Sequence, residues 1–378
     1  MRFDTRLVQS GQRARSGSGD LIPPIHIATT YERGPQVPPR YFYGRSENPT
    51  WESLEECLAA LEDARFATVY ASGQAAATTV LSLLEPGQTV LASDDLYAGT
   101  HALLDRLPRA GIGVEYADLS DPPQARRALG PGREGDVALV WVETPSNPLL
   151  KITDLDALGR LAHERGAIVV VDNTLASPAL QQPLRWADVS LYSTTKFIAG
   201  HLDALGGALV YDDEALHERF LAYRELAGNV PGDLDSYLIR RGLKTLSLRV
   251  ARQVESARVV VDALRGAPAA GAIHYPGLPG HPGHDVATRQ MSAPGSMISF
   301  EYRGDVQRLL ADVRVFAPAV SLGGVQSLVE CPASMTHCSI PAEERRRRGI
   351  GDSLLRLSIG IEDPADLVAD LEAAMHPC

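Results

Sequence analysis

The sequence predicts an α/β protein built on a mostly parallel sheet that is flanked by helices. Apolar stretches typical of strands (89–93, 138–144, 167–174 and 188–195) alternate with stretches of helical periodicity. The strands are apolar on both faces, as expected for strands buried in a parallel sheet between two layers of helices. Ligands of such sheets gather beyond the carboxyl ends of the strands, so we expect a site there.

One helix of this pattern can be placed between two of the strands. The segment "TDLDALGRLAHERGA" (153–167) has leucines at helical spacing, with Thr153 as a candidate N-cap and Gly166 as a candidate end. It follows the strand at 138–144 and precedes the strand at 167–174. The three together predict a βαβ unit.

The length and composition predict about two domains. The chain has 378 residues, of which 44% are hydrophobic, enough for sizeable cores. Residues 1–45 are rich in Gly, Pro and Arg and predict an N-terminal arm. Residues 46–241 form the predicted large domain, and residues 242–378 form a smaller α+β C-terminal domain that begins within a long helical stretch, 233–266.

Charge and cysteine usage exclude several classes of function. The formal net charge is -11, so the chain is expected to bind neither nucleic acid nor an anionic membrane. No run of about 18 apolar residues and no signal-peptide core is present, which predicts a cytoplasmic location. The cysteines at 57, 331, 338 and 378 form no C-x-x-C pair, so we expect neither a metal site nor a disulfide framework.

A lysine stands at the end of a predicted strand. It is Lys196 in "SLYSTTKFIAGH" (190–201). An amine desolvated there loses affinity for its proton, and the neutral form can attack an aldehyde to give a Schiff base. Ser193 and Thr195 offer hydroxyl groups suited to a phosphate. The alternative is a capping turn with an exposed lysine.

A lysine-bound aldehyde cofactor that carries a phosphate is pyridoxal phosphate, whose pyridine nitrogen must stay protonated. Asp172 ends the preceding predicted strand, 24 residues before Lys196, and is placed to hold that proton. As an Asp-Asn pair it also suits an N-cap or an Asx turn.

The phosphate requires backbone donors as well. The segment "YASGQAAATTVLSLL" reads as a strand, a turn of small residues and a helix, whose first amides favour an anion. Gly73 allows close approach, although the same residues are compatible with a simple tight helix start. Tyr97 in "DDLYAGT" offers a ring that could stack on the pyridine, or that could serve only in packing.

Many motifs in this order resemble the pyridoxal-phosphate enzymes of cysteine and methionine metabolism. This group contains cystathionine γ-lyase, cystathionine γ-synthase, cystathionine β-lyase and methionine γ-lyase. The motifs that carry the resemblance are "YGRSENPT", "ASGQAAA", "DDLYAGT", "ETPSNP", "VVDNTLASP", "STTKFIAGH", "RGLKTLSLR", "YPGL", "AVSLGGVQSLVECPASMTH" and "LLRLSIGIED". The resemblance implies a fold-type I pyridoxal-phosphate transferase fold.

The resemblance implies roles for the cofactor residues. Lys196 binds the cofactor covalently and moves protons, with Tyr97 beside it at the ring, and Asp172 pairs with the pyridine nitrogen. Phosphate ligands are implied at Gly73, Gln74, Ser193 and Thr195.

The amino-terminal Tyr-x-Arg of this family reaches the phosphate of the neighbouring subunit. Tyr43 and Arg45 match it. The resemblance therefore implies active sites shared between two chains, in a homotetramer that is a dimer of dimers.

Substrate residues are implied in the same way. Arg356 would clamp the substrate α-carboxylate, which suits its bidentate fork, and Asn147 and Ser327 would assist. Cystathionine-cleaving γ-lyases of this group tend to have charged residues at three positions of the distal pocket. The corresponding residues in this chain are Phe42, Ala102 and Gln326.

An uncharged distal pocket predicts a small uncharged leaving group. Desolvating the second ammonium and carboxylate of cystathionine without partners would be costly. We therefore expect γ-elimination of a methionine-like substrate to α-ketobutyrate, ammonia and a thiol. Cystathionine γ-lyase, cystathionine γ-synthase and a catalytically silent binding protein on the same fold are the alternatives.

Overall fold

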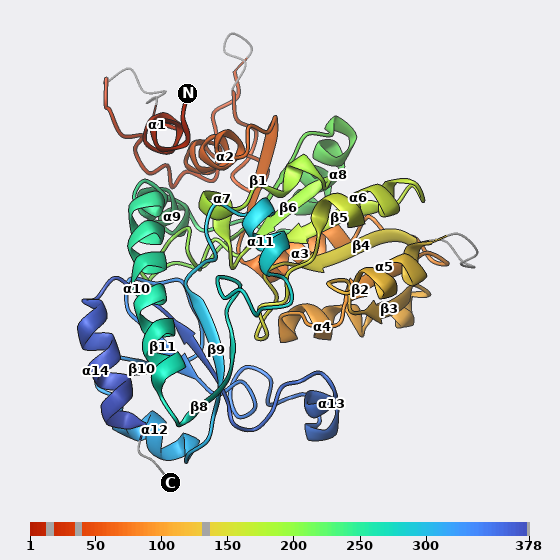
Figure 1. Cartoon of the computed structure of the whole chain (residues 1–378). Helices are drawn as coiled ribbons and strands as arrows, with labels where there is room; N and C mark the ends of the chain where they lie inside the picture. The colour runs from red at the N-terminus through yellow and green to blue at the C-terminus, as the bar shows by residue number, and fades with distance from the viewer. Residues whose placement is uncertain (13–18, 35–39, 131–136, 376–378) are drawn as a thin grey trace.

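The computed structural model describes residues 1–12, 19–34, 40–130 and 137–375, which build two sheets surrounded by helices (Figure 1). Within these residues the larger sheet has seven strands in the order β1-β7-β6-β5-β4-β2-β3, and β7 alone runs antiparallel to its neighbours. The predicted α/β fold with a mostly parallel sheet is confirmed. The strands are β1 (Phe66–Tyr70), β2 (Thr89–Ser93), β3 (Gly113–Ala117), β4 (Val137–Glu143), β5 (Ile168–Asp172), β6 (Val189–Tyr192) and β7 (Gly207–Tyr211).

Helices cover both faces of this sheet. On one face α3, α4 and α8 pack against apolar side chains such as Trp141. On the opposite face α2 and α9 cover one part, and α5 and α6 cover another. The helices up to this point are α1 (Phe3–Gln9), α2 (Pro49–Leu61), α3 (Gly73–Leu81), α4 (Ala98–Leu104), η1 (Leu107–Ala110), α5 (Pro122–Leu129), α6 (Leu155–His163), α7 (Ser177–Leu180), η2 (Pro183–Arg185), α8 (Glu214–Ala227) and α9 (Asp233–Leu243).

The N-cap predicted for α6 was wrong by one residue. Asp154 is the N-cap, and its carboxylate accepts the N–H of Ala157 at 3.2 Å. The N–H of Thr153 instead donates to the hydroxyl of Thr144 at 3.0 Å, which ties Thr153 to the loop after β4. Both Thr and Asp are good N-cap residues. The hydrogen bond between Thr153 and Thr144 keeps Thr153 in the loop, so Asp154 caps the helix.

The smaller sheet has five described strands in the order β10-β11-β12-β9-β8. It is mainly antiparallel, and with its helices it forms the predicted α+β part of the chain. Its elements are α10 (Leu246–Gly266), β8 (Ala270–His274), α11 (His284–Gln290), β9 (Met297–Tyr302), α12 (Val306–Asp312), β10 (Ala317–Pro318), β11 (Leu328–Glu330), α13 (Ala342–Arg347), β12 (Leu354–Ser358) and α14 (Pro364–Ala374).

Helix α10 belongs to both cores. Its first half, including Leu246 and Val250, packs in the cluster with α2 and β1. Its second half, including Val260 and Leu264, packs in the core of the smaller sheet with α14. Figure 1 shows this helix running from the region of α9 down beside the smaller sheet. The exact boundaries after residues 45 and 241 stay predictions.

Alternation along the small sheet directs two charged side chains away from its core. Leu355 and Leu357 of β12 and Val329 of β11 lie in the apolar cluster with α10 and α14. Successive side chains of a strand point to opposite faces, so Arg356 and Glu330 point away from that cluster. The two residues are directly opposite each other in the ladder and are only 2% and 1% exposed.

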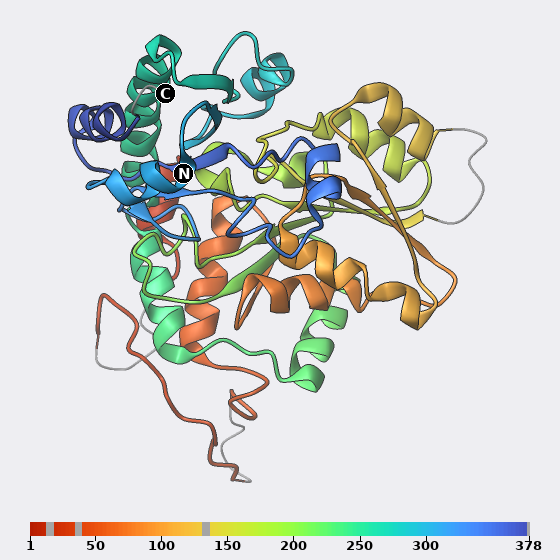
Figure 2. The same cartoon turned by 90° about the horizontal axis from the view of Figure 1, so that it is seen from below.

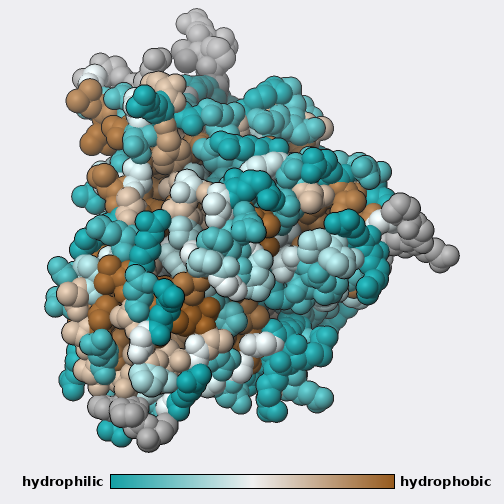
Figure 3. Space-filling view, viewed as in Figure 1, coloured by the Kyte–Doolittle hydropathy of each residue, from teal (hydrophilic) through white to brown (hydrophobic). Residues whose placement is uncertain are grey.

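The N-terminal segment is the least covered part of the described chain. Figure 2 shows it extending away from the body, and Figure 3 shows hydrophobic side chains over it as well as at other places on the same face. Leu21 and Ile27 are 87% and 79% exposed. Within the described ranges no helix has both the length and the apolar character needed to cross a membrane.

Candidate active site

A cavity of about 210 Å³ lies where the carboxyl ends of the large-sheet strands face β12 of the small sheet. The structure brings together here most of the predicted cofactor and substrate residues. The predicted residues that line the cavity are Gly73, Gln74, Tyr97, Asn147, Asp172, Ser193, Thr195, Lys196 and Arg356.

Parallel register explains this convergence. In the ladders Glu143 of β4 is paired with Asp172 of β5, and Asp172 is paired with Leu191 of β6. Parallel strands end at the same edge, so the polar residues that close them become neighbours in space. Three segments far apart in sequence therefore line one cavity.

Lys196 lies in this cavity on the turn that follows β6. Its Nζ donates to the hydroxyl of Ser321 at 2.7 Å. Burial, with a further contribution from the charge of Arg356, lowers the pKa of Lys196 to about 8, although Glu330 opposes the shift. A substantial fraction of the amine is therefore neutral in mildly alkaline solution. This partly buried position does not fit the alternative of an exposed lysine on a capping turn.

Two buried carboxylates from neighbouring strands lie in the same cavity as the lysine. Asp172 accepts the N–H of Thr174 at 3.0 Å, the Asx turn that its sequence also suggested. Burial raises the pKa of Asp172, and burial together with the nearby Asp172 charge raises the pKa of Glu143. Among the described residues neither carboxylate forms an ion pair with a side-chain cation, so a protonated ring nitrogen fits this place.

The start of α3 forms the far end of the cavity. Ser72 caps this helix by accepting the N–H of Ala75 at 3.1 Å. The amides of Gly73 and Gln74 come before the first helical hydrogen bond, which Ala76 donates to Ser72 at 3.1 Å. They are therefore free of helical partners and suit an anion.

Close packing at this point favours a glycine. A Cβ on Gly73 would lie 3.0 Å from the Cβ of Ser193 and 3.3 Å from its hydroxyl. The turn before α3 and the turn after β6 thus approach within contact distance. They form a narrow cradle of backbone amides and a hydroxyl, which fits the phosphate of pyridoxal phosphate.

Thr195 is held by the neighbouring strand. Its hydroxyl donates to the carbonyl of Gly206 at 3.2 Å and accepts the N–H of Gly206 at 3.0 Å. In this arrangement the hydroxyl hydrogen is already directed at the chain. The phosphate role of Thr195 stays a prediction.

Arg356 reaches the cavity from the small sheet with three of its donors engaged. Its Nη1 lies 2.9 Å from a carboxylate oxygen of Glu330 and 2.7 Å from the amide oxygen of Asn147. Its Nη2 donates to the carbonyl of Ser321 at 2.8 Å. The Nε is buried without a partner among the described residues. A guanidinium has five N–H groups, so Nε and one hydrogen of Nη2 remain for a carboxylate.

Ser327 is not brought to the cavity, which corrects its predicted place beside Arg356. Its N–H and its hydroxyl donate to the carboxylate of Glu362 at 2.6 and 2.8 Å. Ser321 lines the cavity in its stead and bonds to both Lys196 and Arg356. Both serines belong to "SLGGVQSL", and Ser321 has a left-handed backbone with a φ of +95°.

The five remaining predicted residues lie away from this cavity in the single chain. Phe42 and Tyr43 are 58% and 40% exposed, and Arg45 donates to the carbonyl of Glu225. Ala102 and Gln326 are also exposed and do not line it. A site shared with a second chain, which would use the first three residues, stays a prediction.

Sequence reasoning gave no role to two acidic residues at the site, Glu143 and Glu330. The carboxylate of Glu143 accepts a hydrogen bond from the N–H of Tyr97 at 2.8 Å, and the carboxylate of Glu330 accepts one from the hydroxyl of Thr336 at 2.9 Å. Glu143 ends a predicted strand, so its position was available as a signal. The place of Glu330 depends on which strand pairs with β12, and the sequence does not show this.

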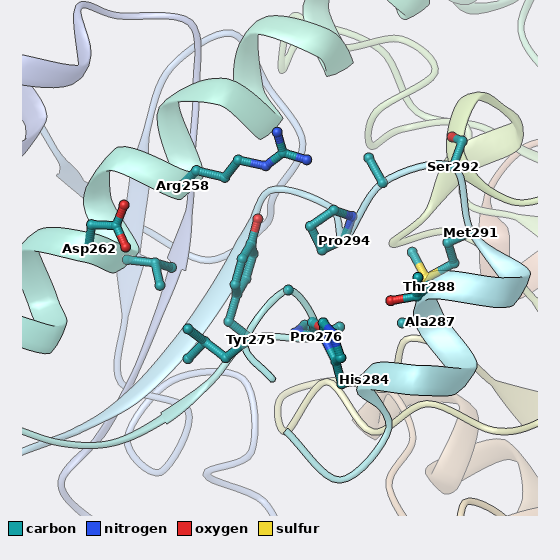
Figure 4. Close-up of a pocket in the computed structure, with 14 residues that line it drawn as sticks. Arg258, Asp262, Tyr275, Pro276, His284, Ala287, Thr288, Met291, Ser292 and Pro294 are labelled. Carbon is teal, nitrogen blue, oxygen red and sulfur yellow. The ribbon is translucent and has the colours of Figure 1, made fainter. Parts of the chain in front are cut away.

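A second cavity, of about 460 Å³, lies between α10 and α11 (Figure 4). Arg258 points into it from α10, and Tyr275 stands at its centre with its hydroxyl bonded to the carbonyl of Gly295 at 3.1 Å. His284 bonds through Nδ1 to the carbonyl of Pro276. This cavity has neither a lysine nor a buried carboxylate pair, so chemistry and not volume identifies the candidate active site.

The fold and the site together define an enzyme of the fold-type I pyridoxal-phosphate class. The sequence model of the family "Cys/Met metabolism PLP-dependent enzyme" matches residues 4–376. The chain belongs to this family, and pyridoxal phosphate is its cofactor. It is a pyridoxal-phosphate enzyme of the carbon-sulfur lyase and γ-synthase group.

Individual relatives cover nearly the whole chain. A cystathionine γ-synthase of Mycobacterium tuberculosis is 45% identical over 98% of this chain and 96% of its own length. A crystal structure described as the cystathionine γ-lyase CalE6 of Micromonospora echinospora is 62% identical, with a TM-score of 0.97 and full coverage of both chains. A structure of apo CalE6, described as a methionine γ-lyase, is 61% identical, with a TM-score of 0.94 over 100% and 99% of the two chains.

Proposed function

We propose that this enzyme catalyses the γ-elimination of L-methionine to α-ketobutyrate, ammonia and methanethiol. The observation that carries the proposal is the uncharged character of Phe42, Ala102 and Gln326, the three positions assigned to the distal pocket. In the distal pocket that the resemblance assigns to these positions, a charged leaving group would be desolvated without partners, whereas a thiomethyl group has no such cost. The relative described as a methionine γ-lyase supports the same substrate.

Pyridoxal phosphate, when bound, supplies an electron sink for the carbanion character that develops at the substrate. Asp172 would hold the ring nitrogen in its protonated form, and Tyr97 would pack against the ring. The amides of Gly73 and Gln74 and the hydroxyl of Ser193 would bind the phosphate.

Lys196 is the group that moves protons. Because its pKa is lowered, the Lys196 amine is neutral in a fraction of the molecules. A neutral amine can accept a proton from Cα of the substrate. Ser321 accepts a hydrogen bond from the same Nζ and so keeps the amine pointed into the cavity. As a positioned base, Lys196 would also return protons to the substrate carbon skeleton.

Arg356 orients the substrate. Its free Nε and Nη2 hydrogens would bind the α-carboxylate, while Asn147 and Glu330 fix the plane of the guanidinium. A carboxylate held at this edge would direct Cα of the substrate toward Lys196 and the substrate side chain toward the rim.

Cystathionine γ-lyase and cystathionine γ-synthase are the second candidates. The description of CalE6 as a cystathionine γ-lyase favours the first, and the mycobacterial relative favours the second. Both reactions use the same cofactor residues and differ from the proposed one at the rim. We further propose a cytoplasmic homotetramer, in which Tyr43 and Arg45 of one chain complete the phosphate site of another.

Steady-state kinetics with four substrates tests the proposal. L-methionine, L-cystathionine, O-acetyl-L-homoserine and L-cysteine are compared by kcat/KM, with α-ketobutyrate and the released thiol measured separately. The proposal expects the highest value for L-methionine. A wide advantage for L-cystathionine, or replacement products from O-acetyl-L-homoserine with L-cysteine, contradicts it.

A further inference from the structure

A buried arginine donates hydrogen bonds to the backbone of the turn that carries Lys196. Arg249 lies on α10 and is 5% exposed. Its Nη1 donates to the carbonyl of Phe197 at 2.8 Å, and its Nη2 donates to the carbonyl of Ile198 at 3.2 Å. These two residues directly follow Lys196. The guanidinium therefore binds the carbonyl end of the turn that begins at the end of β6.

The same guanidinium joins this turn to the rest of the molecule. Its Nη2 also donates to the carbonyl of Gly242 in α9 at 2.8 Å, and its Nε donates to the hydroxyl of Thr245 at 3.1 Å. Among the described residues no carboxylate forms an ion pair with Arg249. Burial lowers the pKa of Arg249 to about 10. A buried cation held only by dipoles is costly, so the four hydrogen bonds of Arg249 must offset the loss of its hydration.

Two glycines make room for this contact. A Cβ on Gly200 would lie 2.0 Å from Nη1 of Arg249, and Gly200 has a left-handed backbone with φ of +72°. A Cβ on Gly242 would lie 2.0 Å from the carbonyl oxygen of Ala199. Both sites admit only glycine, because larger residues would push α9 or the guanidinium away from the turn.

One helical turn further along α10, Gln253 contacts the loop that carries Ser321. Gln253 is fully buried, and its Nε2 donates to the carbonyl of Gly324 at 2.8 Å. Residues four apart on a helix share one face, so Arg249 and Gln253 point the same way. Helix α10 therefore contacts both the turn of Lys196 and the loop of Ser321. The hydrogen bond from Nζ of Lys196 to the hydroxyl of Ser321, at 2.7 Å, joins this turn and this loop directly.

We propose that Arg249 and Gln253 are positioning residues, which fix the Lys196 turn and the Ser321 loop relative to each other through α10. The inference rests on the proposed function only in assigning Lys196 as the cofactor lysine. The N-terminal half of α10 lies in the core of the large sheet and its C-terminal half lies in the core of the small sheet, so the helix is a rigid reference for both. Loss of either contact would let Nζ and its acceptor drift apart.

The test uses purified holoenzyme variants. Arg249→Lys keeps the positive charge but loses the several donors of the guanidinium, and Arg249→Met loses both. Gln253→Met removes the hydrogen bond to the carbonyl of Gly324. Arg265→Met is the matched control, because Arg265 is on the same helix and its side chain is 62% exposed. The visible absorbance of the bound cofactor is titrated with pH, cofactor affinity is measured by reconstitution, and kcat and KM are measured with L-methionine.

A positioning role predicts a shift in the pH midpoint of the cofactor absorbance of about half a unit or more in each Arg249 variant and in Gln253→Met. It also predicts a fall in kcat of about tenfold to hundredfold. KM should change by less than about threefold, because Arg356 is untouched. Arg265→Met should behave as the parent.

A merely structural role gives a different pattern. The melting temperature then falls while the absorbance midpoint, the cofactor affinity and kcat per bound cofactor stay at the parent values, and this result overturns the proposal. If Arg249→Met does not fold, Arg249→Lys and Gln253→Met decide by the same criteria. The absorbance titration needs no substrate, so a failure of L-methionine turnover in the parent would overturn the proposed function and leave this test intact.

Discussion

The two sheets present opposite electrostatic arrangements to the same cavity. At the edge of the large sheet, Asp172 and Glu143 are buried, and neither forms an ion pair with a side-chain cation among the described residues. At the small sheet, Arg356 and Glu330 are buried as an ion pair with 2.9 Å between their charged atoms. The first edge is arranged to receive a positive group, and the second already holds a balanced pair with donors to spare.

The difference separates cofactor binding from substrate binding in physical terms. Unpaired buried carboxylates are unstable as anions, so a cationic ring nitrogen stabilises them by its own charge. The paired guanidinium is fixed in place by Glu330 before substrate arrives, and a carboxylate then completes its open hydrogen bonds. The unpaired edge should therefore react most strongly to mutation of charge.

The strongest test of the unpaired edge is Asp172→Asn. We expect kcat/KM for L-methionine to fall about hundredfold to thousandfold, because the charge that keeps the ring nitrogen protonated is lost. Asp156→Asn is the control, since Asp156 is a partly exposed residue of α6 that pairs with Arg160. A change of less than about threefold in Asp172→Asn would remove the basis of the comparison.

The lysine between the two edges predicts a pH effect. Only the neutral amine forms the bond to the cofactor, and the folded chain lowers the pKa of Lys196 from its usual 10.5 to about 8. The neutral fraction therefore grows as pH rises through 8. Reconstitution of the apoenzyme, followed by absorbance, should be about fiftyfold faster at pH 8 than at pH 6. A rate that is flat between these pH values, or that still rises tenfold per unit above pH 9, argues against the lowered pKa.

The paired edge is tested by Arg356→Lys. An ammonium cannot reproduce the fork, so we expect KM for L-methionine to rise about tenfold or more while kcat changes less. Arg265→Lys serves as the control on an exposed arginine of α10. If kcat falls and KM does not move, Arg356 is not the carboxylate clamp.

A further buried carboxylate, Glu62, extends the comparison to stability. It accepts hydroxyl groups from Tyr192 at 2.5 Å and Ser190 at 2.9 Å, and burial raises its pKa from 4.5 to about 7. Between these two pKa values the folded state binds more protons than the unfolded state. The contribution of Glu62 to the stability of the folded protein is therefore lost as pH rises from 4.5 to 7.

Replacing this carboxylate should remove that pH dependence. As pH rises from 5 to 8, the melting temperature of Glu62→Gln minus that of the parent should increase by about 2–4 °C. The exposed control Glu164→Gln should show no such change. Equal slopes for parent and Glu62→Gln would show that burial does not perturb the carboxylate.

The sequence was sufficient for the large-sheet edge because a parallel sheet brings the ends of its strands together. Asp172 ends β5 and Lys196 lies on the turn that follows β6, and both placements are local information. The other edge depends on pairing between β11 and β12, which no local pattern reveals, and so Glu330 was missed. Ser327 was chosen where Ser321 acts, because the bonds of Ser321 to Lys196 and Arg356 and of Ser327 to Glu362 join residues far apart in the sequence.

The rim shows a second limit of the sequence. Phe42, Tyr43 and Arg45 were assigned by resemblance to a site that two chains share. Within one chain they lie outside the cavity. Physical reasoning from local patterns places residues within a sheet, but the partner of an exposed segment is set by assembly.

The central claim is that Lys196 carries the cofactor, and the chain has only three lysines on which to test it. Lys151 is bonded to Asp94 and Asp118, and Lys244 is bonded to the carbonyls of Leu7 and Ser10. Holoenzyme is reduced with borohydride and digested, and its peptides are analysed by mass spectrometry. The account predicts a single pyridoxyl adduct on the peptide that contains Lys196. An adduct on Lys151 or Lys244, or none at all, would contradict it.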